Sequence, residues 1–118
     1  MKPRVRSRVD LLQGTLDLLI LRTLLFGANH GHALAKHIQR SSEDLLQVET
    51  GSLYPALHRL EAKGSINASW ELSEKGKQAK YYQLTAKGRR ELLAARSKWE
   101  AFSRAVALVL NPAESESL

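Results

Sequence analysis

The stretch that decides the fold is residues 50–84, TGSLYPALHRLEAKGSINASWELSEKGKQAKYYQL. Its first part has apolar residues at the spacing of one buried helix face, and Gly64 follows as a residue suited to end a helix. Its second part alternates apolar and polar residues as two strands do, around the turn Glu74-Lys75-Gly76-Lys77. A helix able to enter a DNA groove beside a basic hairpin is the arrangement of a winged helix-turn-helix.

The expected helix in this stretch begins within Thr50-Gly51-Ser52 and carries Pro55 in its first turn, where a missing N–H costs little. The outer face is polar near its beginning, where Ser52 and backbone N–H groups are suited to meet a phosphate. One turn further on, His58 and Arg59 can reach base edges or phosphates. The predicted buried face is Leu53, Ala56, Leu57 and Leu60.

The two expected strands form the wing. In the first, Ile66, Ala68, Trp70 and Leu72 should point to one side and Asn67, Ser69 and Glu71 to the other, and Trp70 is expected to pack between the wing and the core. The second strand is expected over residues 79–84, with Tyr82 and Leu84 inward. The lysines of the turn, Lys75 and Lys77, are expected to contact phosphates, because each such contact releases counterions from DNA.

Three more helices are expected around this unit. The first covers residues 15–26, with Thr15 as its N-cap and Gly27 as its end. The second begins near Gly31-His32 and ends at Arg40 or Ser41. The last is capped by Thr85 and continues to about Leu110, before Asn111-Pro112.

The first and last of these helices indicate a dimer. The first is apolar on nearly every side, so a second layer must cover it, either the C-terminal helix or another subunit. The last has apolar residues at alternating steps of three and four, a coiled-coil-like seam whose simplest partner is a second copy across a two-fold axis. The predicted dimer interface is Leu16, Leu19, Ile20, Leu92, Ala95, Trp99, Phe102, Val106 and Val109.

Composition fits a basic protein of one compact domain. The chain has 118 residues, 43% of them hydrophobic, a formal net charge of +6 and no cysteine. Excess positive charge favours nucleic acid as a partner, and the lack of cysteine excludes disulfides and thiolate metal sites. Residues 16–26 are too short to span a bilayer and contain Arg22, so a soluble cytoplasmic protein that does not bind membranes is expected.

The predicted fold class is mainly α with a small β-hairpin. Its parts are a flexible basic arm (1–9), a winged helix-turn-helix DNA-binding domain (10–85), a C-terminal dimerisation helix (86–110) and a disordered acidic tail (111–118). The arm either remains solvated or touches phosphates or a minor groove.

No enzyme, cofactor or metal site is expected. The acidic residues and potential nucleophiles show no catalytic arrangement. None of the four histidines has a partner at the i, i+4 spacing that a helical metal site commonly uses.

Three sequence blocks resemble the PadR family of transcriptional regulators, in its short form with a single C-terminal dimerisation helix. They are Gly14-Thr15-Leu16-Asp17, residues 49–60 (ETGSLYPALHRL) and residues 80–88 (KYYQLTAKG), and the His30-Gly31-His32 start of the second helix agrees with them. The middle block is the most specific. The position of His32 is often tyrosine in the family, so no role is carried over to that ring.

The resemblance implies a homodimeric repressor that binds an inverted repeat in double-stranded promoter DNA. It implies DNA contacts by Ser52, Tyr54, Pro55, His58, Arg59, Lys75, Lys77 and Lys80. Some relatives bind planar aromatic compounds near the dimer helices, which makes Trp99 a candidate surface for a small-molecule effector, although dimer packing is the simpler role. The alternative function is a winged-helix module that recruits a protein. The polar outer face of the helix that begins within Thr50-Gly51-Ser52 argues against this alternative.

Overall fold

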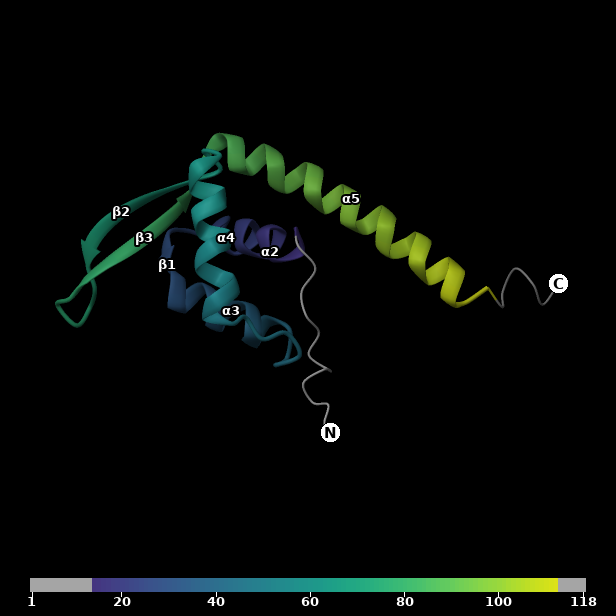
Figure 1. Cartoon of the computed structure of the whole chain (residues 1–118), viewed down its shortest axis with the longest axis horizontal. Helices are drawn as coiled ribbons and strands as arrows, with labels where there is room; N and C mark the ends of the chain where they lie inside the picture. Colours follow the sequence, from purple (N-terminus) through teal and green to yellow (C-terminus); the bar gives the residue numbers. More distant parts are fainter. Residues whose placement is uncertain (1–13, 113–118) are drawn as a thin grey trace.

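The computed structural model describes residues 14–112. The expected basic arm (1–9) and residues 113–118 of the expected tail lie outside this range. The elements in chain order are α2 (Thr15–Leu24), β1 (Asn29–His30), α3 (Gly31–Ser41), α4 (Thr50–Ala62), β2 (Ile66–Leu72), β3 (Gln78–Leu84) and α5 (Ala86–Leu110). Helices α2, α3 and α4 form a compact group, from which the β2–β3 hairpin projects to one side and α5 to the other (Figure 1). This is the expected mainly α winged helix-turn-helix.

Helix α2 lies at the centre of the core. It packs against α3, α4, α5 and β3, which explains why its apolar residues surround the axis. Its Ile20 is fully buried. Two predictions about its ends were wrong. Gly14 rather than Thr15 occupies the N-cap position, without a side-chain cap, and the helix ends at Leu24 rather than Phe26.

The sheet has a third strand that the sequence did not reveal. Strand β1 pairs antiparallel with β3, so the strand order is β1-β3-β2. Its second residue, His30, is also the N-cap of α3, where its Nδ1 accepts a hydrogen bond of 3.2 Å from the Ala33 N–H. The His30 ring meets the Tyr81 ring edge-on, with 5.5 Å between centroids. One residue therefore joins the sheet to the start of α3.

Helix α4 ends as expected, at a left-handed glycine. Gly64 has a φ of 81°. The Gly64 N–H donates to the Glu61 carbonyl at 3.0 Å and the Ser65 N–H to the Leu60 carbonyl at 2.9 Å, which is a Schellman motif. The placement of Pro55 in the first turn was wrong, because α4 begins at Thr50 and Pro55 is therefore inside the helix.

The wing is a regular antiparallel hairpin that extends beyond the core. Ile66 pairs with Leu84 at its base and Leu72 with Gln78 near its turn. Ile66 and Tyr82 are buried, whereas Trp70 is 66% exposed. The expected packing of Trp70 against the core was wrong, because the hairpin has already left the core at that point.

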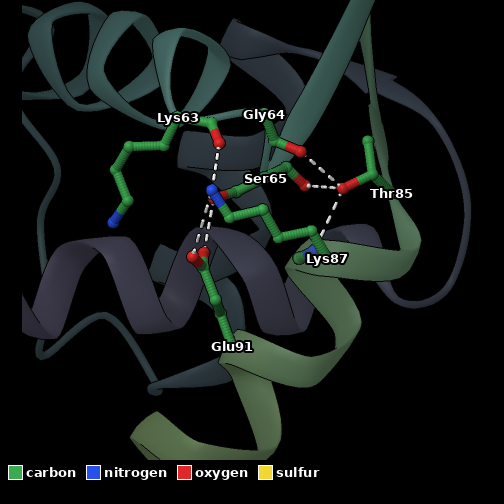
Figure 2. Close-up of polar contacts among 7 residues, drawn as sticks. Lys63, Gly64, Ser65, Thr85, Lys87 and Glu91 are labelled. Carbon is green, nitrogen blue, oxygen red and sulfur yellow. Dashed lines mark hydrogen bonds and ion pairs between the residues drawn. The ribbon is translucent and has the colours of Figure 1, made fainter.

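A polar joint attaches α5 to the end of α4 and the base of the wing (Figure 2). The Thr85 hydroxyl accepts from the Gly88 N–H at 3.0 Å and lies 2.7 and 2.9 Å from the carbonyl oxygens of Gly64 and Ser65, between which it shares its single O–H. The Ser65 hydroxyl donates to Glu91, and the Lys87 ammonium to the Lys63 carbonyl. Thr85 is thus the N-cap of α5, as expected, and also ties the helix to the preceding turn.

Candidate nucleic-acid interface

The outer face of α4 presents polar and small side chains to solvent. Ser52, Pro55, His58 and Arg59 are exposed, while Leu53, Ala56, Leu57 and Leu60 are buried on the opposite side. No side chain caps the beginning of α4, where Glu49 occupies the N-cap position. The Ser52 and Leu53 N–H groups donate to the Glu49 carbonyl at 3.0 and 2.9 Å, whereas the N–H groups of Thr50 and Gly51 can donate to an external acceptor such as a phosphate oxygen.

Tyr54 lies on the flank of α4 that faces the start of α3. Its side chain is 39% exposed. A Cβ added at Gly31 would lie only 2.8 Å from the Tyr54 hydroxyl oxygen and 2.9 Å from its ring. Gly31 therefore makes room for Tyr54, which fits α3 and α4 together while keeping part of its ring accessible to a ligand.

Arg59 is held in place by an ion pair that the sequence did not reveal. Its Nη2 lies 2.9 Å from Asp17 Oδ1 in the first turn of α2, and its side chain remains 43% exposed. A pair this exposed contributes roughly 1 kcal/mol or less to stability, so it orients the guanidinium without preventing it from moving to a phosphate or base.

Lys80 lies within strand β3, opposite Trp70 of β2, rather than in the turn at the tip of the wing. Its Nζ is 3.4 Å from Glu61 Oε1 and 5.6 Å from the centre of the Tyr82 ring. Burial raises the pKa of the Tyr82 phenol above its ordinary value, and the nearby Lys80 cation opposes that rise. Because Lys80 already has a carboxylate partner, its ammonium is less available to DNA than those of the turn.

The wing turn holds its two lysines out in solvent. Both Lys75 and Lys77 are exposed. The Ser73 hydroxyl accepts hydrogen bonds from their backbone N–H groups at 3.3 and 3.2 Å, and Gly76 has a φ of 76°. Ser73 and Gly76 thus fix the shape of the turn that presents the lysines. The serine at the start of a polar turn was the available sequence signal for this role.

A groove separates the wing from α4. Its volume is about 480 Å³. The wall on the α4 side includes Tyr54 and His58, and the wall on the wing side includes Trp70, Gln78 and Lys80. The start of α3 closes one end with His30, Gly31 and His32. Of the expected DNA-contacting residues, Tyr54, His58 and Lys80 line this groove, whereas Ser52, Pro55, Arg59, Lys75 and Lys77 lie outside its lining.

The residues predicted for the dimer interface fall into two sets. Leu16, Ile20 and Leu92 are 6%, 0% and 3% exposed, so they belong to the core of their own chain and offer almost no area to a second one. Leu19 and Ala95 are half-buried. Trp99, Phe102, Val106 and Val109 remain exposed, from 37% for Val106 to 78% for Val109. The uncovered part of the predicted seam is therefore the second half of α5.

Trp99 also borders a small cavity. It stands beside Phe102, with ring centroids 6.1 Å apart, and both rings face the start of α2 at Gly14, Thr15 and Leu18. The volume of this cavity is about 290 Å³.

Within residues 14–112, no three side chains of the metal-binding types gather as a metal site would require. No helix in that range combines the length and apolar character needed to cross a membrane.

Comparison with known proteins agrees with this geometry. The profile described as "Transcriptional regulator PadR-like family" matches residues 20–94. An uncharacterized protein of Lysinibacillus sphaericus is 30% identical over 108 residues, which cover 91% of this chain and 98% of that one.

The solved structures with similar folds include two PadR-family regulators. A PadR family transcription regulator from Clostridium difficile has a TM-score of 0.70 at 29% identity, over 80% of this chain and 97% of its own. A padr family transcriptional regulator from Eggerthella lenta has a TM-score of 0.71 at 31% identity, over 83% of each chain.

Proposed function

Since this chain belongs to the PadR-like family of transcriptional regulators, whose winged helix binds DNA, we propose that it is a repressor that binds an inverted-repeat operator as a homodimer. The observation that carries the proposal is that one chain has two exposed surfaces of different chemistry. One is the polar face of α4 beside the basic wing turn, and the other is the uncovered apolar half of α5.

The first surface supports reading of duplex DNA. Helix α4 enters the major groove, where the Ser52 hydroxyl and the N–H groups of Thr50 and Gly51 meet a phosphate. His58 and Arg59 reach base edges or phosphates. Tyr54 and Pro55 lie on the same part of α4 and border the major groove that the helix enters. The lysines of the turn contact the neighbouring backbone, with Lys80 in a supporting position behind them.

The second surface supports pairing of two chains. One side of α5 carries an exposed apolar strip made of Trp99, Phe102, Val106 and Val109. Leaving a strip of this length in water is unfavourable in free energy. Packing this strip against its copy across a two-fold axis buries it and gives the dimer two α4 helices. In the DNA complex they lie roughly 34 Å apart, one turn of duplex, so both reach successive major grooves of a palindrome.

An aromatic effector is a further part of the proposal. A planar compound that stacks on Trp99 in the cavity beside Phe102 would release the operator, provided that it binds the DNA-incompetent arrangement of the two chains more tightly. The affinity of this compound should fall when Trp99 is replaced by Ala, as measured by isothermal titration calorimetry.

The test combines DNA binding with mass determination. A labelled duplex from the region upstream of the coding gene is titrated with protein over a series of salt concentrations, and the complex is analysed by sedimentation. We expect tight binding that weakens steeply with salt, at two chains per duplex. Weak binding that hardly depends on salt would refute the DNA role and favour a protein-interaction module. One chain per duplex would refute the dimer.

A further inference from the structure

The inner face of the wing carries two large apolar side chains that the rest of the described chain leaves in solvent. Trp70 is 66% and Leu72 67% exposed, although they alternate on the same side of β2 as the fully buried Ile66. A tryptophan is a costly residue to leave in water on a hairpin that no core supports. This position calls for a partner that covers the inner face.

The position of Trp70 identifies that partner. Trp70 pairs with Lys80 in the strand register and borders the groove opposite Tyr54 and His58 of α4. Further along the hairpin, the turn presents Lys75 and Lys77 to solvent. A duplex that touches both α4 and the turn must pass over the surface between them, which is the inner face of the wing.

The chemistry of this surface also fits DNA. Deoxyribose rings give the walls of the minor groove an apolar surface, and proteins place apolar side chains against it or between base steps there. The lysines that follow Leu72 supply the attraction for phosphates, and no acidic side chain lines the groove between Trp70 and α4.

We propose that Trp70, supported by Leu72, is a DNA-contacting residue of the wing that packs against the deoxyribose surface of the operator beside α4. This inference rests on the proposed DNA-binding function and assigns a contact of a different kind to the wing. The lysines bind phosphates through charge and release counterions, whereas the indole displaces water from an apolar surface. The contribution of Trp70 to affinity should therefore be nearly independent of salt.

The first test uses the fact that the chain has only two tryptophans. In a Trp99→Phe variant, which keeps an aromatic ring on α5, all tryptophan emission comes from Trp70. The free protein should emit as a water-exposed indole that acrylamide quenches readily. Addition of the upstream duplex should change the emission and protect it from acrylamide, while the anisotropy of the labelled duplex in the same sample reports binding.

Two results would overturn the proposal. One is emission that is already shielded from acrylamide before DNA is added, which would mean that a second copy or another part of the protein covers Trp70. The other is unchanged emission and quenching while the anisotropy shows a saturated duplex, in which case DNA binding stands and only the contact fails. If neither this variant nor the wild-type protein binds any duplex, the proposed function and this inference fail together.

The second test measures affinity against salt. Trp70→Ala should weaken binding by roughly ten-fold at every salt concentration, the scale of one aromatic contact in an interface, without changing the slope of log affinity against log salt. Trp70→Phe should retain most of the affinity, and Ser69→Ala, on the opposite face of β2, should retain all of it. Because Trp70 is exposed, none of these variants should lose thermal stability. A Trp70→Ala protein that binds like wild type would refute the contact.

Discussion

Replacing Gly88 by Ala tests the joint that holds α5 on the winged domain. An added Cβ would lie 2.1 Å from the Ser65 carbonyl oxygen and 2.8 Å from a methyl carbon of Leu84. The oxygen cannot simply move aside, because it accepts from the Thr85 N–H at 3.1 Å and lies 2.9 Å from the Thr85 hydroxyl. The methyl group can be accommodated only by shifting the start of α5 or by breaking its cap.

The expected cost follows from these contacts. Forcing an extra methyl into a packed site costs about 1–3 kcal/mol, and losing a helix cap adds about 1 kcal/mol. An alanine inside a helix recovers up to about 1 kcal/mol relative to glycine. The free energy of unfolding of Gly88→Ala should therefore fall by about 1–3 kcal/mol.

Urea unfolding followed by circular dichroism at fixed protein concentration measures this change. Gly51→Ala is the matched control, because Gly51 also lies in the first turn of a helix but an added Cβ there would have no atom within 4 Å. That variant should be as stable as wild type or slightly more stable. If Gly88→Ala unfolds at the wild-type urea midpoint, the carbonyl of Ser65 does not constrain α5 and the reasoning about the joint is wrong.

Three further predictions concern DNA binding, alkaline stability and assembly. Arg59→Ala should weaken operator binding by about 1–3 kcal/mol in an anisotropy titration but lower the free energy of unfolding by at most about 1 kcal/mol. Lys77→Ala should weaken binding to all DNA sequences alike and reduce the slope of log affinity against log salt by about one. Equal slopes for Lys77→Ala and wild type would contradict the phosphate contact of Lys77. Burial raises the pKa of Tyr82 in the folded chain, so the contribution of its phenol to stability is complete below the ordinary pKa of 10.0 and is lost as pH rises through the folded pKa. In urea titrations at alkaline pH, Tyr82→Phe should therefore lose less stability with rising pH than wild type. Equal losses in the two proteins would refute this prediction. Phe102→Glu should convert dimers to single chains in sedimentation velocity without lowering helix content, and an unchanged sedimentation coefficient would place the dimer contact elsewhere.

The elements with strong periodicity were predictable from the sequence. Helices α3, α4 and α5 begin and end within about a residue of their expected bounds, because their capping residues, Gly64 and Thr85 among them, act locally. The expected division of α4 into a buried and an exposed face is also confirmed. The β1 strand was not predictable, because two residues show no period and depend on β3, which lies about fifty residues later in the chain.

The candidate site was less predictable because its geometry depends on contacts between distant residues. Alternation placed Trp70 on the same side of β2 as Ile66 but could not show that the core ends before Trp70. Similarly, nothing in the spacing of Asp17 and Arg59 indicates that the two meet. The roles of individual side chains at the DNA and dimer surfaces remain predictions that the experiments above test.

The way α5 is attached has a mechanical consequence. At 1.5 Å per residue its 25 residues extend about 37 Å, but only its first two turns bury residues in the body of the chain. Helix α5 therefore acts as a lever that is fixed only at its first two turns. A rotation of about 10° at that attachment would move the far end by roughly 6 Å. In a pair of chains joined near those far ends, the stiffness of the Thr85–Ser65 attachment sets how much variation in half-site separation the two winged domains tolerate. A more flexible attachment should thus broaden the range of operator spacings that are bound, even where affinity for the best spacing hardly changes.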